Sequence, residues 1–330
     1  MNGISTSFIA NVHYGDEITY VIGHRHADAD SVFSAMALAR LMNQMGVKAE
    51  ARTTSEPDRE TAAVLLELRL TAPEILEHAE GLQLTMVDHN SFSQAVKGAD
   101  KARVVGIYDH HALSETATVD IVPVFIMPVG STGTIVYCLY RQVGVEIDKE
   151  TAGILAAAIM SDTNNCRYQG STELDKFALN DLITIAGLDR AAFNRVRLMG
   201  RVDYSGMTER QILKNDYRRY NIAGHPVGIG YARSVGIENH MEMLARMEKE
   251  LAAYYSTSKC ELLYMMIHDY DTDRQDILCA GEGALETAER AIGSRDGTRI
   301  TLENSISRKA DFIPALTKVL MEEEANGLPV

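Results

Sequence analysis

The chain has 330 residues, of which 46% are hydrophobic and 24% charged, values that are ordinary for a globular protein with two domains. Its formal net charge of −14 argues against broad binding to nucleic acids or anionic membranes, because both need a basic surface. We expect a cytoplasmic protein, because no apolar run is long enough to span a membrane, the N-terminus lacks a signal-peptide pattern, and the four cysteines form no CxxC pair.

The first 200 residues or so alternate between short apolar runs and segments with helical spacing of apolar residues. Strands are predicted for residues 17–24, 47–53, 82–90, 102–111 and 119–130. Helices are predicted for residues 31–46, 56–70, 132–144, 149–163, 173–187 and 189–200, and Ser131 or Thr132 is expected to cap the third of them. The alternation predicts an α/β domain with a mostly parallel sheet that helices cover on both faces.

The helical pattern breaks at RVDYSGMT, residues 201–208. We therefore expect a larger domain over residues 1–198, a hinge or linker over 199–207, and a smaller domain over 208–330. The elements predicted beyond the break are a helix to about residue 216, a hairpin-like strand pair in 220–235, a helix over 239–258, strands within 260–272 and 275–281, and a final helix. This order predicts a smaller α/β domain with a mixed sheet.

Acidic and histidine side chains gather where several predicted strands or apolar runs end. They are His24, Asp28 and Asp30 in GHRHADADSV, Asp88 in LTMVDHN, Asp109, His110 and His111 in VVGIYDHH, and Asp162 in AAAIMSDTNN. Ligands of open α/β sheets bind beyond the carboxyl ends of the strands, so at least three of these four segments should deliver their side chains to one rim.

Each of these residues also has an ordinary structural explanation. Asp30 could cap the helix that follows it, Asp88 could close a strand with an Asx-turn, and Asp162 could cap a helix or start a turn. Of the adjacent His110 and His111, one could be buried and the other solvated. These explanations would have to coincide at every strand end, so a shared ligand site is the favoured interpretation.

The types of ligand indicate which metals would bind. Carboxylates and imidazoles without thiolates suit Mn²⁺, Co²⁺ or Fe²⁺ better than a cysteine-rich zinc site, whereas Mg²⁺ usually prefers oxygen ligands and water. Five or six protein ligands exceed what one ion needs if water and substrate also bind. The set therefore predicts two ions, about 3.5–4 Å apart, that share a carboxylate. Such a pair activates a bridging water and stabilises charge on the attacked and departing oxygens, which indicates hydrolysis at phosphorus.

The motifs GHRHADADS, VDHN, DHH and SDT occur in this order and resemble those of the DHH phosphoesterase superfamily. Within it, the chain is more similar to the family II, manganese-dependent inorganic pyrophosphatases, because SRKADFIP at residues 307–314 resembles their SRKK motif and following proline. The resemblance covers nearly the whole chain. It implies a two-metal enzyme that hydrolyses a phosphoanhydride, first of all inorganic pyrophosphate, with a metal-bridged hydroxide, and a homodimer formed through the larger domain.

The resemblance also implies a role for each site residue. Six would be metal ligands, with His24 and Asp28 on one ion, Asp30 and His110 on the other, and Asp88 and Asp162 shared or bridging. Asp109 would orient His110, and His111 would face substrate phosphate as an acid or hydrogen-bond donor. Arg308 and Lys309 would hold phosphates when the domains close. The cofactors implied are two divalent cations, Mn²⁺ with Co²⁺ as the alternative, and additional Mg²⁺ bound with substrate.

The chain departs from the family pattern at the positions that would bind phosphate. His26 and Ala27 replace an asparagine and a proline, so a third histidine enters the metal loop, where we expect it to contact substrate. Ala310 replaces the last lysine of SRKK, and Met207 lies where the family offers another phosphate-binding lysine. The metal chemistry is thus preserved, while the phosphate contacts are fewer.

Two other functions remain open from the sequence. One is a DHH-type phosphoesterase or exopolyphosphatase that acts on short polyphosphate or a nucleotide phosphoester. The nucleotide-cleaving branch carries a GGGH motif near its C-terminus, and this motif is absent here. The other is a regulator that binds phosphate or metal without turnover, against which the intact ligand set argues.

Overall fold

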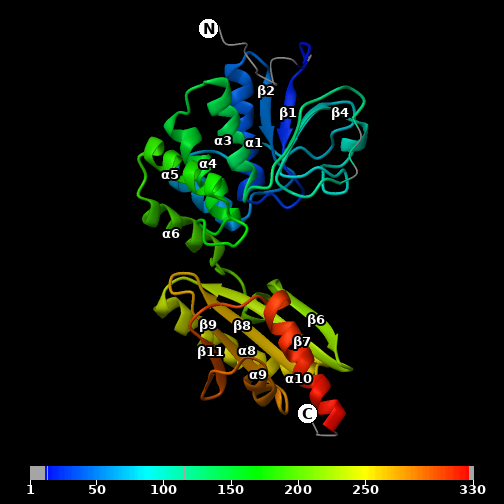
Figure 1. The fold of residues 1–330 in the computed structure, drawn as a ribbon, viewed down its shortest axis with the longest axis vertical. Helices are drawn as coiled ribbons and strands as arrows, with labels where there is room; N and C mark the ends of the chain where they lie inside the picture. Colours follow the sequence, from blue (N-terminus) through cyan, green and yellow to red (C-terminus); the bar gives the residue numbers. More distant parts are fainter. Residues whose placement is uncertain (1–11, 13, 115, 117, 327–330) are drawn as a thin grey trace. The chain divides into compact units, whose positions relative to one another are not determined.

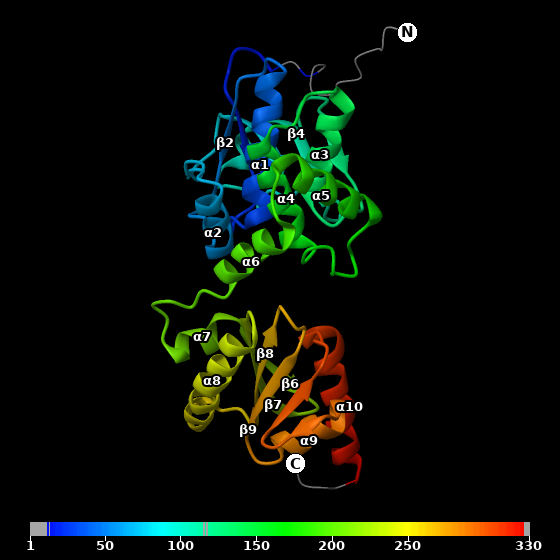
Figure 2. The same cartoon turned by 90° about the vertical axis from the view of Figure 1, so that its left-hand side faces the viewer.

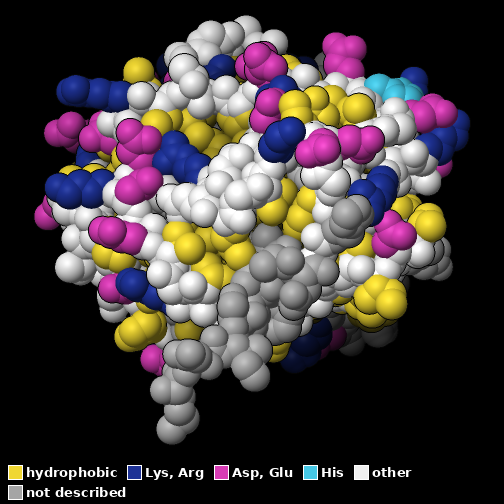
Figure 3. Space-filling view, turned by 90° about the horizontal axis from the view of Figure 1, so that it is seen from above, with side chains coloured by type: hydrophobic (Ala, Val, Ile, Leu, Met, Phe, Trp, Pro, Cys, Tyr) yellow, Lys and Arg dark blue, Asp and Glu magenta, His cyan; other side chains and the backbone are white. Residues whose placement is uncertain are grey.

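The computed structural model describes residues 12, 14–114, 116 and 118–326 (Figure 1). The chain divides into two compact units, Met1–Gly200 (unit 1) and Arg201–Val330 (unit 2), and each has its own sheet. A search of the described helices finds none long and apolar enough to cross a membrane. On the face of the molecule seen in Figure 3, basic and acidic side chains are interspersed, so neither sign of charge dominates that face.

Unit 1 contains every element that the sequence predicts for it, most of them shorter at the ends. Its strands are β1 (Thr19–Ile22), β2 (Ala49–Arg52), β3 (Gln83–Val87), β4 (Arg103–Asp109) and β5 (Val124–Ile126). Its helices are α1 (Ala29–Gln44), α2 (Arg59–Glu67), the 3₁₀ turn η1 (Ala99–Lys101), α3 (Thr132–Val143), α4 (Lys149–Asp162), α5 (Glu173–Ala186) and α6 (Arg190–Arg201), the last of which ends one residue into unit 2.

The sheet of unit 1 is parallel throughout, in the order β2-β1-β3-β4-β5, which confirms the predicted α/β class. Alternate side chains of its strands enter two different cores. One core is formed by α1, α3 and α4, which pack on one another, while α1 and α3 also pack on the sheet (Figure 1). The other core joins Ile22, Leu84 and Met86 to residues of the segment 76–102. The described cover of that second face is therefore η1 and connecting chain rather than α-helices, which is less than the predicted helices on both faces.

Unit 2 folds around a mixed six-stranded sheet. Its elements are α7 (Glu209–Asn215), β6 (Tyr217–Ile222), β7 (His225–Ser234), α8 (Ile237–Ser258), β8 (Leu262–Asp269), β9 (Gln275–Ala280), α9 (Ala284–Ile292), β10 (Arg295–Asp296), β11 (Arg299–Leu302), the π-helical turn η2 (Arg308–Phe312) and α10 (Ile313–Asn326). The strand order is β10-β11-β9-β8-β7-β6, and β7 and β8 are parallel while the other pairs are antiparallel. This arrangement confirms the predicted mixed sheet.

The sheet of unit 2 has a helical layer on each face (Figure 2). Helices α7 and α8 share one core with it, and α9 and α10 share the other. The sequence prediction omitted α9 and the β10–β11 hairpin, because both are short. Asp296-Gly297, where β10 ends and the turn begins, is a turn signal that would have indicated the hairpin.

Candidate metal centre

The topology of unit 1 explains why distant motifs meet. The strand order reverses between β1 and β3, which makes this point of the sheet the expected ligand site. Ile22 of β1 pairs with Met86 of β3, so the side chains two residues further on, His24 and Asp88, emerge at the same level. Val87 pairs with Tyr108 of β4, so the DHH motif follows at the same edge.

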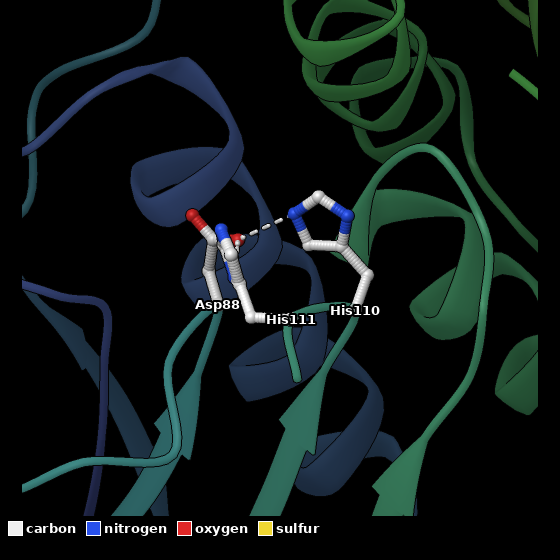
Figure 4. Close-up of side chains that lie close together, drawn as sticks. All are labelled: Asp88, His110 and His111. Carbon is white, nitrogen blue, oxygen red and sulfur yellow. Dashed lines mark ion pairs between the residues drawn. The ribbon is translucent and has the colours of Figure 1, made fainter. Parts of the chain in front are cut away.

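Two groups of ligand atoms share one carboxylate. In the first group, His24 Nε2 lies 3.4 Å from Asp28 Oδ2 and 3.2 Å from Asp88 Oδ2. In the second, His110 Nε2 lies 3.3 Å from Asp88 Oδ1, 3.4 Å from Asp162 Oδ2 and 3.9 Å from Asp30 Oδ2. Figure 4 shows the ring of His110 pointing at the carboxylate of Asp88. Both oxygens of Asp88 are thus engaged, one with each group.

The structure therefore brings the six predicted ligands together. The two predicted bridging residues, Asp88 and Asp162, differ in their positions. Asp88 belongs to both of these groups and also to a third, with His110 and His111. Asp162, the last residue of α4, groups with Asp30, Asp88 and His110 and not with His24 and Asp28 among the described residues. The geometry supports sharing for Asp88 and places Asp162 in the second group alone.

The histidine contacts show that this site fits metal ions. Nδ1 of His110 lies 3.2 Å from the carbonyl oxygen of Val129, and Nδ1 of His24 lies 2.6 Å from that of Arg25. A carbonyl accepts only from N–H, so Nδ1 carries the proton in the neutral ring and the lone pair of Nε2 is free for a ligand. Nε2 of His110 is buried, makes no hydrogen bond with the described residues and points at carboxylate oxygens, which is the geometry of a metal-binding imidazole.

Backbone and hydroxyl groups bind the two most buried carboxylates of the ligand set, Asp30 and Asp88, on the side away from the histidines. Asp30 Oδ1 accepts hydrogen bonds from Ser34 Oγ, Ser131 Oγ and the Gly133 amide, and Asp30 Oδ2 accepts one from the Thr132 amide. Three of these donors come from the first turn of α3. One oxygen of Asp30 is saturated in this way, which leaves the other to face the site.

Asp88 receives Ser31 Oγ at 2.8 Å and Thr132 Oγ1 at 3.2 Å. Its backbone φ is +62°, a left-handed conformation that aspartate tolerates better than most residues. Glycine at position 23 leaves room for the side chain of Ser31, because a Cβ on residue 23 would lie 2.5 Å from the Cβ of Ser31. The sequence predicts Ser131 or Thr132 only as a helix cap, and it gives no sign that either reaches a ligand.

One predicted role is wrong. Asp109 orients His111 and not His110: Asp109 Oδ1 lies 2.9 Å from His111 Nδ1 and also accepts the His111 amide at 3.1 Å. Asn90 Nδ2 donates to the other oxygen of Asp109. The two side chains after β4 point in different directions. The ring of His110 points toward the carbonyl of Val129, while the ring of His111 points back toward Asp109 at the end of β4.

Electrostatics in the site reflect the excess of carboxylates. Burial alone would lower the pKa of both inner imidazoles, but close contacts with the carboxylates and their negative charge outweigh it, raising the pKa of His24 to about 11 and that of His110 to about 12. Burial, with repulsion from Asp88, raises the pKa of Asp162 to about 6. In the absence of metal cations, protonation of the two imidazoles therefore balances part of the negative charge of the carboxylates.

A pocket of about 780 Å³ opens beside the first ligand group. Its lining includes His24, Asp28 and His111, together with His26, which is exposed and has a backbone φ of +70°. His26 thus lies at the wall of the pocket and outside the ligand groups, which is where a residue that contacts substrate rather than metal would lie.

The predicted phosphate-binding residues Arg308 and Lys309 lie in unit 2. Arg308 donates to the carboxylate of Asp216 at 2.8 Å and to the carbonyl of the same residue at 2.9 Å, while Lys309 is exposed. Met207 packs against the core that α7 and α8 share with the sheet. The role of Arg308 and Lys309 stays a prediction.

Comparison with known proteins matches two family models to separate parts of the chain. Residues 18–159 match the model of the DHH family, N-terminal domain, and residues 200–319 match that of the DHHA2 domain. A probable manganese-dependent inorganic pyrophosphatase of Archaeoglobus fulgidus is 32% identical over 93% of this chain and 99% of its own length. A manganese-dependent inorganic pyrophosphatase of Methanothrix thermoacetophila is 34% identical over 90% of this chain and 96% of its own length.

Solved structures agree. The structure of a putative family II inorganic pyrophosphatase of Methanococcus jannaschii superimposes with a TM-score of 0.60 at 27% identity, over 92% of this chain and 99% of that one. An exopolyphosphatase-related protein of Bacteroides fragilis, at 13% identity and a TM-score of 0.51 over 97% of this chain and 95% of that one, shares the fold alone. The chain therefore belongs to the manganese-dependent inorganic pyrophosphatases, a family that combines a DHH with a DHHA2 domain.

Proposed function

We propose that this protein is a metal-dependent phosphohydrolase that converts inorganic pyrophosphate to phosphate. The observation that carries the proposal is the sharing of Asp88 between two histidine–carboxylate groups at the switch point of the sheet. Two adjacent groups of hard ligands joined by one carboxylate are what a two-metal hydrolase needs. The family to which the chain belongs supports the same reaction.

Two divalent cations, Mn²⁺ with Co²⁺ as the alternative, would be held by the six ligand residues. His24, Asp28 and Asp88 would form one site, and Asp30, His110, Asp162 and Asp88 the other. When bound, these cations would lower the pKa of a coordinated water and neutralise charge on the phosphate oxygens. Additional Mg²⁺ would bind together with the substrate. The hydroxyls and amides behind Asp30 and Asp88 fix the carboxylates, so that little reorganisation is needed when charge develops.

His111 would act on the substrate rather than on the metal. The hydrogen bond to Asp109 raises the pKa of the His111 imidazole, so the protonated form persists to higher pH than in a free imidazole. Because Nδ1 bonds to Asp109, Nε2–H is left to face the pocket that His111 lines. From there it can donate a hydrogen bond or a proton to a phosphate oxygen. We propose the same phosphate-binding role, without proton transfer, for His26, Arg308 and Lys309.

The test is a phosphate-release screen on the purified full chain. Pyrophosphate, tripolyphosphate, a nucleoside triphosphate and a phosphodiester would each be offered with Mn²⁺, Co²⁺ or Mg²⁺. We expect release from pyrophosphate with Mn²⁺ to be the fastest. A preference for tripolyphosphate or the diester would show that the protein is an exopolyphosphatase or a phosphoesterase instead. If no substrate releases phosphate, the protein would be a binding protein without turnover.

We further propose that the protein acts in the cytoplasm as a homodimer formed through unit 1. All four cysteines are free thiols, which suits a reducing compartment. β5 is an edge strand, and Val119 and Ile121 just before it are fully exposed, as expected for a surface that a second copy covers. Light scattering would measure the mass in solution, and Ile121→Lys should shift a dimer to the monomer. A native monomer would contradict the proposal.

A further inference from the structure

We propose that Arg233 is a phosphate ligand, and that with Arg308 and Lys309 it forms an anion-binding pocket in unit 2 for a phosphate group of a linear phosphoanhydride. The inference rests on the proposed function, because it supplies a substrate contact for the same reaction. It adds a residue on a different element, since Arg233 lies on β7 and the other two cations lie in the turn η2.

The pocket has a volume of about 270 Å³, and its lining includes Tyr231, Arg233, Arg308 and Lys309. The turn η2 packs beside β7, because Arg308 Nη1 reaches the carbonyl of Ile229 at 3.5 Å as well as the backbone of Asp216. Two segments that are far apart in the sequence thereby present three cationic side chains to one small space.

The charges in this pocket do not balance. Asp216 is the one carboxylate among the lining residues, and its Oδ1 already pairs with Arg308 at 2.8 Å. Its Oδ2 lies 3.7 Å from a terminal nitrogen of Arg233, which is too long for a hydrogen bond. Lys309 is exposed and forms no ion pair within the described part of the chain. Three cations and one carboxylate leave a local excess of positive charge in a protein whose net charge is −14.

Neutral groups hold the guanidinium of Arg233 in place. Nε donates to the hydroxyl of Tyr270 at 2.8 Å, and the guanidinium carbon lies 4.9 Å from the centroid of the Tyr231 ring. The Tyr231 hydroxyl lies 3.1 Å from His268 Nδ1, and the backbone amide of Arg233 donates to Tyr204, so the supports are themselves fixed. Phenol contacts orient an arginine without neutralising it.

The remaining donors of Arg233 are what a phosphate would use. Its terminal nitrogens make no hydrogen bond with other described residues, while the side chain is 30% exposed, enough to be reached from the pocket. Had Arg233 only a structural role as the partner of Asp216, the carboxylate would bind it closely instead of pairing with Arg308. An oriented guanidinium with free terminal N–H groups, next to two further cations, matches the bidentate recognition of phosphate oxygens.

The test measures binding of tripolyphosphate to the metal-free full chain by calorimetry. Removing the metals stops turnover and leaves the metal centre rich in carboxylates, so that it repels the polyanion. We expect Arg233→Gln to weaken binding by roughly tenfold or more, since a charge-assisted contact is lost, and Arg233→Lys to fall between it and the native protein. Arg218→Gln is the matched control, because Arg218 is an exposed arginine on the adjacent strand β6 that donates to the carbonyl of Tyr217.

The control should bind within about twofold of the native protein, because Arg218 does not line the pocket and its exposed charge is screened by solvent and salt. Native-like binding by Arg233→Gln, equal weakening by Arg218→Gln, or no binding by the native chain would each overturn the inference. If Arg233→Gln does not fold, Arg233→Lys carries the comparison. Phosphate release by the native chain with Mn²⁺ is measured in parallel. If no phosphate is released while binding of tripolyphosphate still depends on Arg233, the proposed enzymatic function is wrong but the proposed anion-binding pocket is supported.

Discussion

At the scale of single residues, Asp88 has three features that separate it from an ordinary strand-end aspartate. It is almost fully buried, its backbone φ is positive, and each of its oxygens faces a histidine. An Asx-turn would explain its position but not its burial between two imidazoles. Asp88 is therefore the residue whose chemistry decides whether the two ligand groups work as one site.

Replacing Asp88 with asparagine tests this point. Asparagine also tolerates the left-handed backbone, so the turn should keep its shape. A neutral amide cannot bridge two cations, so phosphate release at saturating Mn²⁺ should fall by at least about a hundredfold, more than the loss of an outer-shell partner causes. The thermal unfolding midpoint of the metal-free variant would show whether the fold is kept. Near-native turnover in a folded Asp88→Asn protein would remove Asp88 from the bridging position.

The pH dependence of metal binding is a second prediction at this scale. In the metal-free site the carboxylates raise the pKa of His24 to about 11 and that of His110 to about 12, so both imidazoles are protonated at neutral pH. Each must lose its proton before it can bind a cation, and protons therefore compete with Mn²⁺. Affinity for Mn²⁺ should rise steadily between about pH 6 and pH 9.

Titration calorimetry in buffers with different ionisation enthalpies would count the protons that leave. We expect net proton release at neutral pH, with a further contribution below it from Asp162, whose pKa is raised to about 6. An affinity that does not change over this range, with no proton release, would show that the histidines are neutral before the metal arrives.

At the scale of elements, the sequence predicted the position of a site residue best where its motif directly follows a strand. Three of the four motifs follow strands and indicated the rim of the sheet because parallel strands end at a common edge, whereas Asp162 lies at the end of helix α4. The support of Asp30 from α3 could not be predicted, because Ser131 and Asp30 are 101 positions apart and meet only when α3 packs on α1. The role of Asp109 was mistaken for a similar reason, since the direction of each histidine depends on the turn after β4.

The N-terminus of α3 can be tested with a pair of helix caps. Ser131 caps α3 and also donates to Asp30, whereas Asp148 caps α4 through the Thr151 amide, and no metal-binding group includes it. Ser131→Ala and Asp148→Ala should each lower the free energy of unfolding by about 0.5–2 kcal/mol, the usual value of a cap. Only Ser131→Ala should also weaken Mn²⁺ affinity, by roughly tenfold, because it frees Asp30 on the side away from the site. Equal metal affinities in the two variants would mean that α3 supports the fold but not the ligand.

At the scale of the whole molecule, the chain contains two units with separate cores. The hydrophobic clusters of the described residues each lie wholly within unit 1 or wholly within unit 2. The sequence indicated this division through the break in helical pattern at RVDYSGMT, and we propose that residues 199–207 act as a hinge. Between the end of α6 and the start of α7, Asp203, Ser205 and Gly206 are exposed, and Gly206 has a φ of +73°.

Limited proteolysis of the full chain would test the hinge. A protease needs accessible chain outside regular secondary structure, and the segment 203–206, in which Asp203, Ser205 and Gly206 are exposed, meets this condition better than the helices on each side. Cleavage there should come first and leave two compact fragments, since each unit keeps its own core. Mn²⁺ with a non-hydrolysable pyrophosphate analogue should slow the cut if ligand binding restrains the segment, while Mn²⁺ alone should not. A first cut between residues 23 and 163, or a rate that ignores the analogue, would show that residues 199–207 connect the units without moving in response to substrate.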